Sequence, residues 1–451
     1  MIGHFDLWYT VTMLKFNENN EIITEERYRA LLVGLERKED ISYSMDELAG
    51  LAEAANAEVL GKVVQTLEKP NTATLIGKGK VEEVAQLVQN MEADTVIFND
   101  ELSGAQLRNL EDALNVRVID RTILILDIFA ARAESREGKL QVELAQLKYR
   151  MPRLIGFGKS LSRLGGGIGT RGPGEKKLET DRRHIERRMD DIKEELAQLR
   201  KTRGVQRSRR EKSSIPVVAL VGYTNSGKSA LMNRLLSDVD KEEKQVMEKD
   251  MLFATLDTKQ RSIKLDTNRE FILVDTVGFV SKLPHSLVEA FKATLEEVLY
   301  ADLLLHVVDA SYENNKFHID VTNRVIDEIG AGDKEKVTVF NKIDLNPDFE
   351  PPATGTEQLF VSAKENINID KLIEAIKSRI FADKVSTKLL IPYDRGDISS
   401  YLCEKALVNA MDYEEGGTKF TLEMSLEDYQ RLKKYEVISY CGEGSFSRTN
   451  N

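Results

Sequence analysis

The segment IPVVALVGYTNSGKSALMNRLL (Ile215–Leu236) joins an apolar run to an amphipathic run through a loop of small residues. Its spacing G-x-x-x-x-G-K-S is a complete P-loop, which normally lies between a strand and a helix. The glycines let backbone N–H groups curl around phosphate oxygens, and the positive end of the helix adds to this attraction. Lys228 is expected to reach the β- and γ-phosphates of a nucleotide, and the Ser229 hydroxyl to bind Mg²⁺. The loop residues expected to contact the nucleotide are Gly222, Tyr223, Thr224, Asn225, Ser226, Gly227, Lys228, Ser229 and Ala230.

A second apolar run, FILVDTVGFV (Phe271–Val280), ends in the motif D-x-x-G. When this motif follows a P-loop, it predicts that Asp275, like Ser229, helps to hold Mg²⁺. It also predicts that the Gly278 amide approaches the γ-phosphate. Phe279 stands where a water-orienting glutamine is often found. A phenyl ring cannot hydrogen-bond water, so we expect slow hydrolysis that a partner, a switch-region backbone or a cation completes. Either the Phe279 ring shields the water, or it simply packs against the following helix.

Two further motifs predict that the base is guanine. VTVFNKIDL (337–345) reads as a strand ending in Asn341, Lys342 and Asp344. A carboxylate at Asp344 can accept hydrogen bonds from the adjacent N1–H and N2–H₂ donors of guanine, a pair that adenine lacks. The run LFVSAKEN (359–366) then places the backbone of Ser362, Ala363 and Lys364 near the guanine O6. Because these motifs follow strands, we expect them at the carboxyl edge of a doubly wound sheet.

The switch threonine and the role of Asn225 each have two possible assignments. In DMLFATLDTKQRSIKL (250–265), Thr255 is the predicted switch threonine that binds Mg²⁺ and the γ-phosphate, and Thr258 is the second choice. Together with Lys228 and Gly278, Thr255 forms the expected catalytic set. The Asn225 side chain could help to hold a monovalent cation such as K⁺, or Asn could be present because it tolerates unusual loop dihedrals.

The rest of the chain suggests a mixed α/β protein of four parts. Residues 1–135 alternate strand-like runs such as DTVIFND with helical patterns, which predicts a mostly parallel sheet. Residues 136–212 predict an antiparallel helical hairpin with a basic glycine-rich tip, because apolar residues recur there at spacings of 3 and 4. Residues 213–383 contain the nucleotide motifs, after a predicted polar linker, QRSRREKSS (206–214). Residues 384–451 predict a small α+β domain. The seam residues of the hairpin are Leu140, Leu144, Leu147, Met151, Ile185, Met189, Ile192, Leu196 and Leu199.

Charge is unevenly distributed in this 451-residue chain. Residues 148–212 contain 20 Lys and Arg residues against 9 Asp and Glu residues, whereas the whole chain has a net charge of −11. A basic segment of this kind can bind a polyanion, and its shortage of aromatic residues favours phosphate contacts over base stacking. The alternative is a solvated coiled-coil face. Two cysteines and no apolar run of about 18 residues favour a cytoplasmic protein without a membrane span.

With these motifs, the chain resembles the HflX family of ribosome-associated GTPases. The resemblance covers residues 25–383 and depends on segments outside the nucleotide motifs, including TLIGKGKVEE (74–83), GGGIGTRGPGEKKLETDRRHI (165–185) and LFATLDT (252–258). It implies that the N-terminal domain and hairpin bind the large ribosomal subunit and its rRNA, with the tip reaching toward the peptidyl-transferase region. It also implies splitting or rescue of stalled ribosomes under stress, and a hydrophobic residue, here Phe279, in place of the catalytic glutamine.

Other functions remain open at the level of sequence. One is a GTP-gated assembly factor for the large subunit. Another is an RNA-remodelling ATPase acting through the N-terminal domain, although no second P-loop occurs there and residues 74–83 also fit an ordinary strand–helix turn. A signalling GTPase on a membrane protein, with peripheral membrane association, is a further alternative. Nothing in the sequence requires a dimer, so a monomer is expected.

Overall fold

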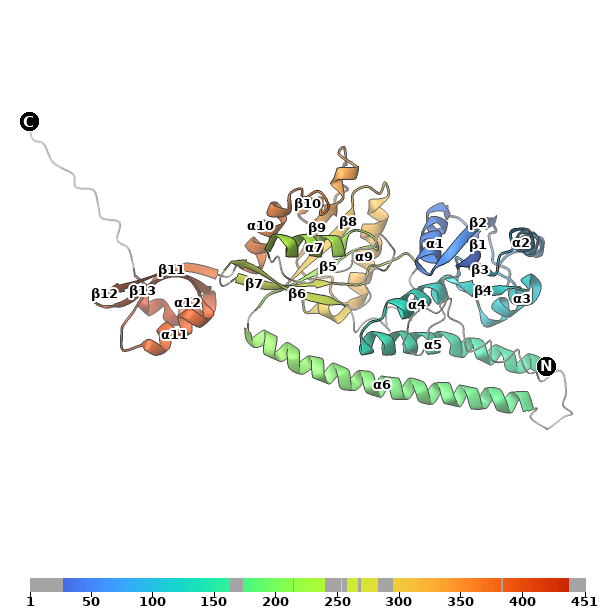
Figure 1. Ribbon diagram of the computed structural model, residues 1–451, viewed down its shortest axis with the longest axis horizontal. Coiled ribbons are helices and arrows are strands. Elements are labelled where there is room, and N and C mark those ends of the chain that lie inside the picture. Colours follow the sequence, from blue (N-terminus) through green and yellow to red (C-terminus); the bar gives the residue numbers. More distant parts are fainter. Residues whose placement is uncertain are drawn as a thin grey trace, which may run out of the picture.

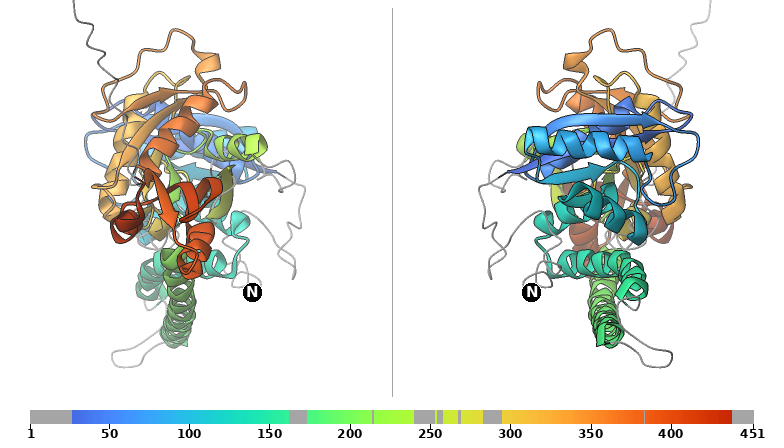
Figure 2. Two further views of the ribbon diagram at one scale, coloured as in Figure 1. Left: turned by 90° about the vertical axis from the view of Figure 1, so that its left-hand side faces the viewer. Right: turned by 90° about the vertical axis from the view of Figure 1, so that its right-hand side faces the viewer.

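The computed structural model describes residues 27–161, 173–213, 215–239, 253, 258–266, 269–282, 295–382 and 384–437. These residues form three lobes in a row, with a long helical hairpin running beneath the first two (Figure 1). The two end-on views in Figure 2 show the hairpin below the lobes. The predicted mixed α/β class, dominated by parallel sheets, is confirmed.

The first lobe is built on a four-stranded parallel sheet of order β2-β1-β3-β4. Alternate residues of β1 enter different cores, because successive side chains of a strand point to opposite faces. Ala30 and Leu32 pack with α1, and Leu31 and Val33 pack with α2 and α3. The elements of this lobe are β1 (Tyr28–Glu36), α1 (Ser42–Ala54), β2 (Ala57–Thr66), α2 (Lys78–Met91), β3 (Thr95–Phe98), α3 (Gly104–Leu114), β4 (Arg117–Asp120) and α4 (Arg121–Arg132).

The hairpin consists of α5 (Arg136–Leu161) and α6 (Pro173–Ser213). All nine predicted seam residues come together in one apolar cluster, so the predicted pairing is confirmed. Arg188 of α6 adds two hydrogen bonds of 2.7 Å to the carboxylate of Glu143 on α5. Residues 162–172 of the predicted tip lie outside the described residues. Residues 206–213 of the predicted polar linker are the last residues of α6, and they are mostly good helix formers.

The second lobe has a six-stranded sheet of order β10-β9-β8-β5-β7-β6, in which only the β6–β7 pair is antiparallel. β5 lies between β7 and β8, inside the sheet. The P-loop that follows β5 therefore begins at the carboxyl ends of these central strands. The elements of this lobe are β5 (Val217–Val221), α7 (Lys228–Val239), β6 (Lys259–Asp266), β7 (Arg269–Asp275), β8 (Leu303–Asp309), α9 (Asn315–Ile329), β9 (Lys336–Asn341), β10 (Gln358–Phe360) and α10 (Ile369–Ile380).

The third lobe is an antiparallel sheet of order β11-β13-β12 with two helices. An ion pair between Arg269 of β7 and Glu423 of β13 joins it to the second lobe. Within the described part of the chain, no helix is long and apolar enough to cross a membrane. The elements of this lobe are β11 (Lys384–Ile391), α11 (Gly396–Lys405), β12 (Leu407–Glu414), β13 (Gly417–Ser425) and α12 (Leu426–Leu432).

The hairpin seam generates a stability prediction. Ile192 is fully buried, whereas the side chain of its neighbour Lys193 is 52% exposed. Ile192→Ala should lower the free energy of unfolding by about 2–4 kcal/mol, because it removes buried methyl groups and leaves a cavity. The loss should appear as a lower urea midpoint for helix circular dichroism. Lys193→Ala is the matched control. Equal urea midpoints for the two variants would contradict the claim that the apolar seam stabilises the hairpin.

Candidate functional site

The P-loop occupies the turn between β5 and α7, where two of its glycines lie very close to neighbouring parts of the chain. A Cβ atom added at Gly222 would lie 2.2 Å from the Val307 carbonyl oxygen, and one at Gly227 would lie 2.2 Å from the Asn341 side-chain nitrogen. Gly227 also has φ of +88°, a conformation that L side chains rarely adopt. Both glycines are therefore required by geometry.

Lys228 is buried at the start of α7. Its Nζ donates to the carbonyl oxygens of Gly222 (3.1 Å) and Tyr223 (2.8 Å). Burial lowers its pKa to about 8, and the nearby Asp275 carboxylate partly opposes this shift. Lys228 therefore remains mainly protonated at neutral pH, as a phosphate-binding lysine must be.

The two predicted Mg²⁺ ligands that the structure describes lie together. The Ser229 hydroxyl donates to Oδ2 of Asp275 at 2.7 Å, and Asp275 is fully buried at the end of β7. Hard oxygen donors of this kind suit Mg²⁺, which usually takes only one or two protein ligands beside phosphates and water. These side chains fit the ion. Thr255, the third predicted ligand, lies outside the described residues, whereas Thr258 is described and partly buried.

Gly278 passes directly over the P-loop. A Cβ atom there would lie 2.7 Å from Thr224 Cα and 3.1 Å from Lys228 Nζ, so only glycine fits. The next residue pairs with the P-loop backbone: the Phe279 N–H donates to the Gly222 oxygen at 3.1 Å, and its carbonyl accepts from the Thr224 N–H at 2.7 Å. The Gly278 backbone is thus held beside the lysine that is expected to bind the γ-phosphate.

The Phe279 side chain is only 2% exposed and packs in the core of the second lobe with Leu295 and Val298. In this structure the ring therefore serves as packing against the segment that follows, which is the second of the two interpretations above.

The predicted base-binding residues gather at one side of the same sheet edge. Oδ1 of Asp344 is buried and makes no hydrogen bond within the described part of the chain, as expected of an acceptor for guanine N–H groups. The Asn341 side chain instead joins two loops, donating to the Ser226 carbonyl and accepting from the Ala363 N–H, each at 3.0 Å. Lys342 has φ of +64°, and its Nζ pairs with Asp309 at 2.8 Å.

The remaining predicted residues are placed by further contacts. Ser362 and Ala363 are buried, and Lys364 is exposed in the loop after β10. Arg234 of α7 holds this loop by donating to the carbonyl oxygens of Ala363 (2.7 Å) and Lys364 (2.9 Å). No local sequence pattern marks Arg234, so sequence reasoning missed it. Asn225 has φ of +58°, which by itself accounts for an Asn at this position.

The side chain of Tyr223 makes contacts that the P-loop pattern did not predict. Its hydroxyl donates to the Glu47 carboxylate on α1 of the first lobe, and its ring stacks on His318 with centroids 3.9 Å apart. A cavity of about 390 Å³ lies here between α1 and the P-loop. Burial lowers the pKa of His318 to about 4, so the imidazole is neutral at pH 7. Sequence reasoning missed Glu47 and His318 because each is distant from the P-loop along the chain.

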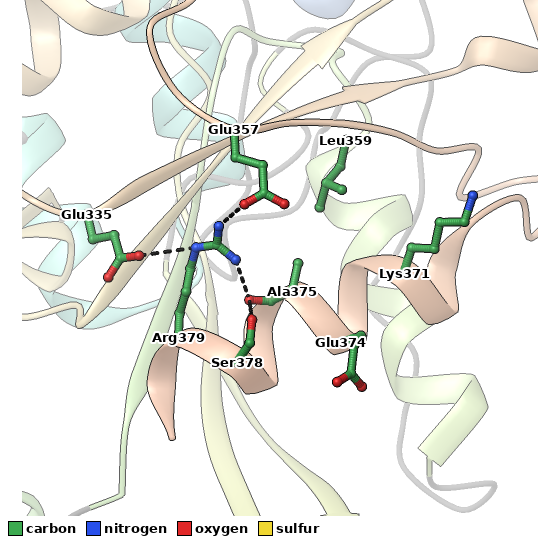
Figure 3. A pocket seen from close by; sticks show the side chains of 8 residues that line it. All are labelled: Glu335, Glu357, Leu359, Lys371, Glu374, Ala375, Ser378 and Arg379. Carbon is green, nitrogen blue, oxygen red and sulfur yellow. Dashed lines mark hydrogen bonds and ion pairs between the residues drawn. The ribbon is translucent and has the colours of Figure 1, made fainter. Parts of the chain in front are cut away.

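Two other places carry no comparable chemistry. A cleft of about 570 Å³ lies at the amino ends of β9 and β10, opposite the nucleotide edge, where Arg379 bridges Glu335 and Glu357 (Figure 3). In residues 74–83, the Gly77 N–H donates to the Gln65 side chain at 2.8 Å at the start of α2, as in an ordinary turn into a helix.

Comparison with known proteins adds to this geometry. Three families match along the chain: a GTP-binding GTPase N-terminal region at residues 42–130, a GTP-binding GTPase middle region at 132–210, and a 50S ribosome-binding GTPase at 217–342. A GTP-binding protein from the archaeon Sulfolobus solfataricus, solved with GDP, is 25% identical over 78% of this chain and 98% of that chain, with a TM-score of 0.41.

Two curated relatives cover most of the chain. GTPase HflX of Caldanaerobacter subterraneus is 48% identical over 95% of this chain and 98% of its own length. GTPase HflX of Escherichia coli strain K12 is 41% identical over 88% of this chain and 93% of its own length. The P-loop geometry and these relatives together show that the chain is an enzyme that hydrolyses GTP. It belongs to the HflX family of GTPases.

Proposed function

We propose that this GTPase is a switch that binds the large ribosomal subunit through its N-terminal lobe and basic hairpin, and splits or rescues stalled ribosomes under stress. The observation that carries the proposal is the combination of a nucleotide site in the second lobe, the part matched by a 50S ribosome-binding family, with a long basic helix beside it. The four-part division at residues 135, 212 and 383 and a cytoplasmic, monomeric protein belong to the same proposal.

The contacts above support the following nucleotide roles. Lys228 binds the β- and γ-phosphates, Ser229 and Asp275 hold Mg²⁺, and Gly278 donates its N–H to the γ-phosphate. A Mg²⁺ ion held by these side chains would neutralise the negative charge that develops on the phosphates. Thr255 completes the metal site in the GTP state, and a monovalent cation beside Asn225 is a subsidiary part of the proposal.

The outer face of α6 supports the contact with rRNA. Arg187, Arg200 and Lys201 are exposed there, and cross-helix ion pairs such as Arg136–Glu195 and Arg188–Glu143 occupy other basic residues of the hairpin. Exposed Lys and Arg side chains on a rigid helix can contact phosphates and release counterions, which makes binding depend strongly on salt.

Lys228→Ala should weaken GTP binding by about 100-fold or more, because it removes a charge-assisted contact to phosphate from a buried site. Calorimetric titration with GTP measures the affinity. Lys316→Ala, at an exposed position on α9, is the control and should bind normally. Wild-type affinity in Lys228→Ala would contradict the assigned site.

Asp344→Asn should weaken GTP binding by about 100-fold and improve binding of xanthosine triphosphate, because an amide cannot accept from both guanine N–H donors but can donate to the xanthine O2. Competition between the two nucleotides against a fluorescent GTP analogue measures the change. Unaltered preference would remove Asp344 from the base site.

With GTP, the full-length protein should lower the light scattering of 70S ribosomes as they separate into subunits. Replacing Arg187, Arg200 and Lys201 together by Gln should raise the protein concentration needed for half-maximal splitting by at least about 10-fold. The number of counterions released on ribosome binding, read from the slope of log affinity against log salt concentration, should fall by about two to three. GTP affinity should stay unchanged.

The matched control replaces three exposed lysines of the third lobe, Lys405, Lys433 and Lys434. Equal splitting by the two triple variants would mean that α6 is only a solvated face. Binding to free large subunits without any loss of 70S particles would instead favour an assembly factor.

A further inference from the structure

A buried polar network joins the first lobe to the two segments that surround the nucleotide phosphates. The Glu47 carboxylate on α1 accepts hydrogen bonds from the Tyr223 hydroxyl of the P-loop and from the Ser281 hydroxyl, three residues after Gly278. The Ser281 N–H donates to the Tyr223 hydroxyl oxygen at 2.6 Å. One carboxylate thus binds both segments.

Arg121, the first residue of α4, holds that carboxylate in place. It forms an ion pair with Glu47, and the two side chains are each only 2% exposed. The same guanidinium donates to the Ser281 carbonyl (3.2 Å), the Ser281 hydroxyl (3.1 Å) and the Asn99 side chain (3.0 Å). Taking both charges out of water is costly, and replacing such pairs by apolar residues is often neutral or stabilising. Stability alone is therefore a weak reason for this pair.

Apolar contacts link the Gly278 segment and a third segment, that of Phe253, to the first lobe. Phe253, two residues before Thr255, is buried and packs edge-on against Phe129 of α4 with ring centroids 4.5 Å apart. Val277 and Val280, on either side of Gly278, belong to the same core cluster. Both segments that change conformation in nucleotide switches therefore contact the first lobe.

The backbone from Gly278 to Ser281 is held at both of its ends. At one end, Phe279 pairs with the P-loop backbone and Gly278 lies beside Lys228. At the other end, Ser281 is bound by Glu47 and Arg121. The Tyr223 ring cannot easily swing away, because it is stacked on His318, and His318 is stacked on Tyr312 and hydrogen-bonded to the Tyr43 hydroxyl at 2.6 Å.

We propose that Glu47, oriented by Arg121, is a positioning residue for GTP hydrolysis that acts through Tyr223 and Ser281 to hold the Gly278 amide at the γ-phosphate. The first lobe thereby sets how strongly the enzyme prefers GTP to GDP, because GDP lacks the phosphate that Gly278 contacts. By reciprocity, GTP also favours this arrangement of the two lobes. The inference depends on the proposed role of Gly278, but not on ribosome binding.

The test uses full-length Tyr223→Phe and Glu47→Gln without ribosomes. Tyr223→Phe keeps the stacked ring and removes only the hydroxyl, so it remains informative if Glu47→Gln folds poorly. In each variant, affinity for a non-hydrolysable GTP analogue and the single-turnover rate should fall by about 10-fold, the effect of losing one hydrogen bond to a charged group. GDP affinity should stay within about twofold of the wild-type value. A general loss of structure would instead weaken the binding of both nucleotides.

Glu53→Gln is the matched control, because Glu53 is an exposed carboxylate on the same helix beside the same cavity. It should behave as the wild type. Gly278→Ala separates the inference from the site assignment. If Gly278→Ala loses the preference for GTP while Tyr223→Phe and Glu47→Gln keep it, the positioning role is overturned and the site stands.

If all three substitutions keep the preference, the assigned role of Gly278 fails as well. Faster turnover in Tyr223→Phe or Glu47→Gln would also overturn the proposal, because the network would then restrain the reaction instead of supporting it.

Discussion

The close contacts of three glycines, two within the P-loop and one in the segment that crosses it, are the constraint on which the site depends. Gly222 touches β8, Gly227 touches Asn341, and Gly278 touches Thr224, at distances that leave no room for a side chain. These contacts bring the ends of β5, β7, β8 and β9 to one point, so that lysine, hydroxyl and carboxylate groups meet at the proposed phosphate site. A displaced strand would separate Ser229 from Asp275 or remove Gly278 from Lys228.

The lobes are joined in two physically different ways. In the hairpin, α5 and α6 meet through an apolar seam with ion pairs along its edges, which needs only the right spacing of apolar residues. Between the first and second lobes, the contact combines a buried ion pair that has hydroxyl partners with an apolar cluster that includes Phe129, Phe253 and valine side chains. Such a polar contact is directional, so a small shift of one lobe changes which hydrogen bonds can form. This property suits a contact that senses the nucleotide.

Much of the site could be predicted from local patterns. Lys228 and Ser229 follow from the spacing of the P-loop, and Asp275 and Asp344 follow from their positions after apolar strands. The hairpin seam is also a local pattern of period 3.5. Asn341 shows the limit of this reasoning: the motif marks it, but its task of joining two loops appears only when Ser226 and Ala363 are brought together. The helical conformation of residues 206–213 could not be predicted, because a charged, polar segment suits a solvated helix as well as a loop.

By itself, the sequence determined the enzyme class, the guanine preference expected from Asp344, and the order of α/β and helical parts, because each of these depends on residues near one another in the chain. Only the tertiary structure decided where Tyr223 and Phe279 point and which residues surround Ser281. Glu47 and Ser281 are 234 positions apart, and no periodicity relates them. Their contact depends on how α1 and α4 of one lobe pack against the P-loop edge of another, which is a property of the folded chain alone.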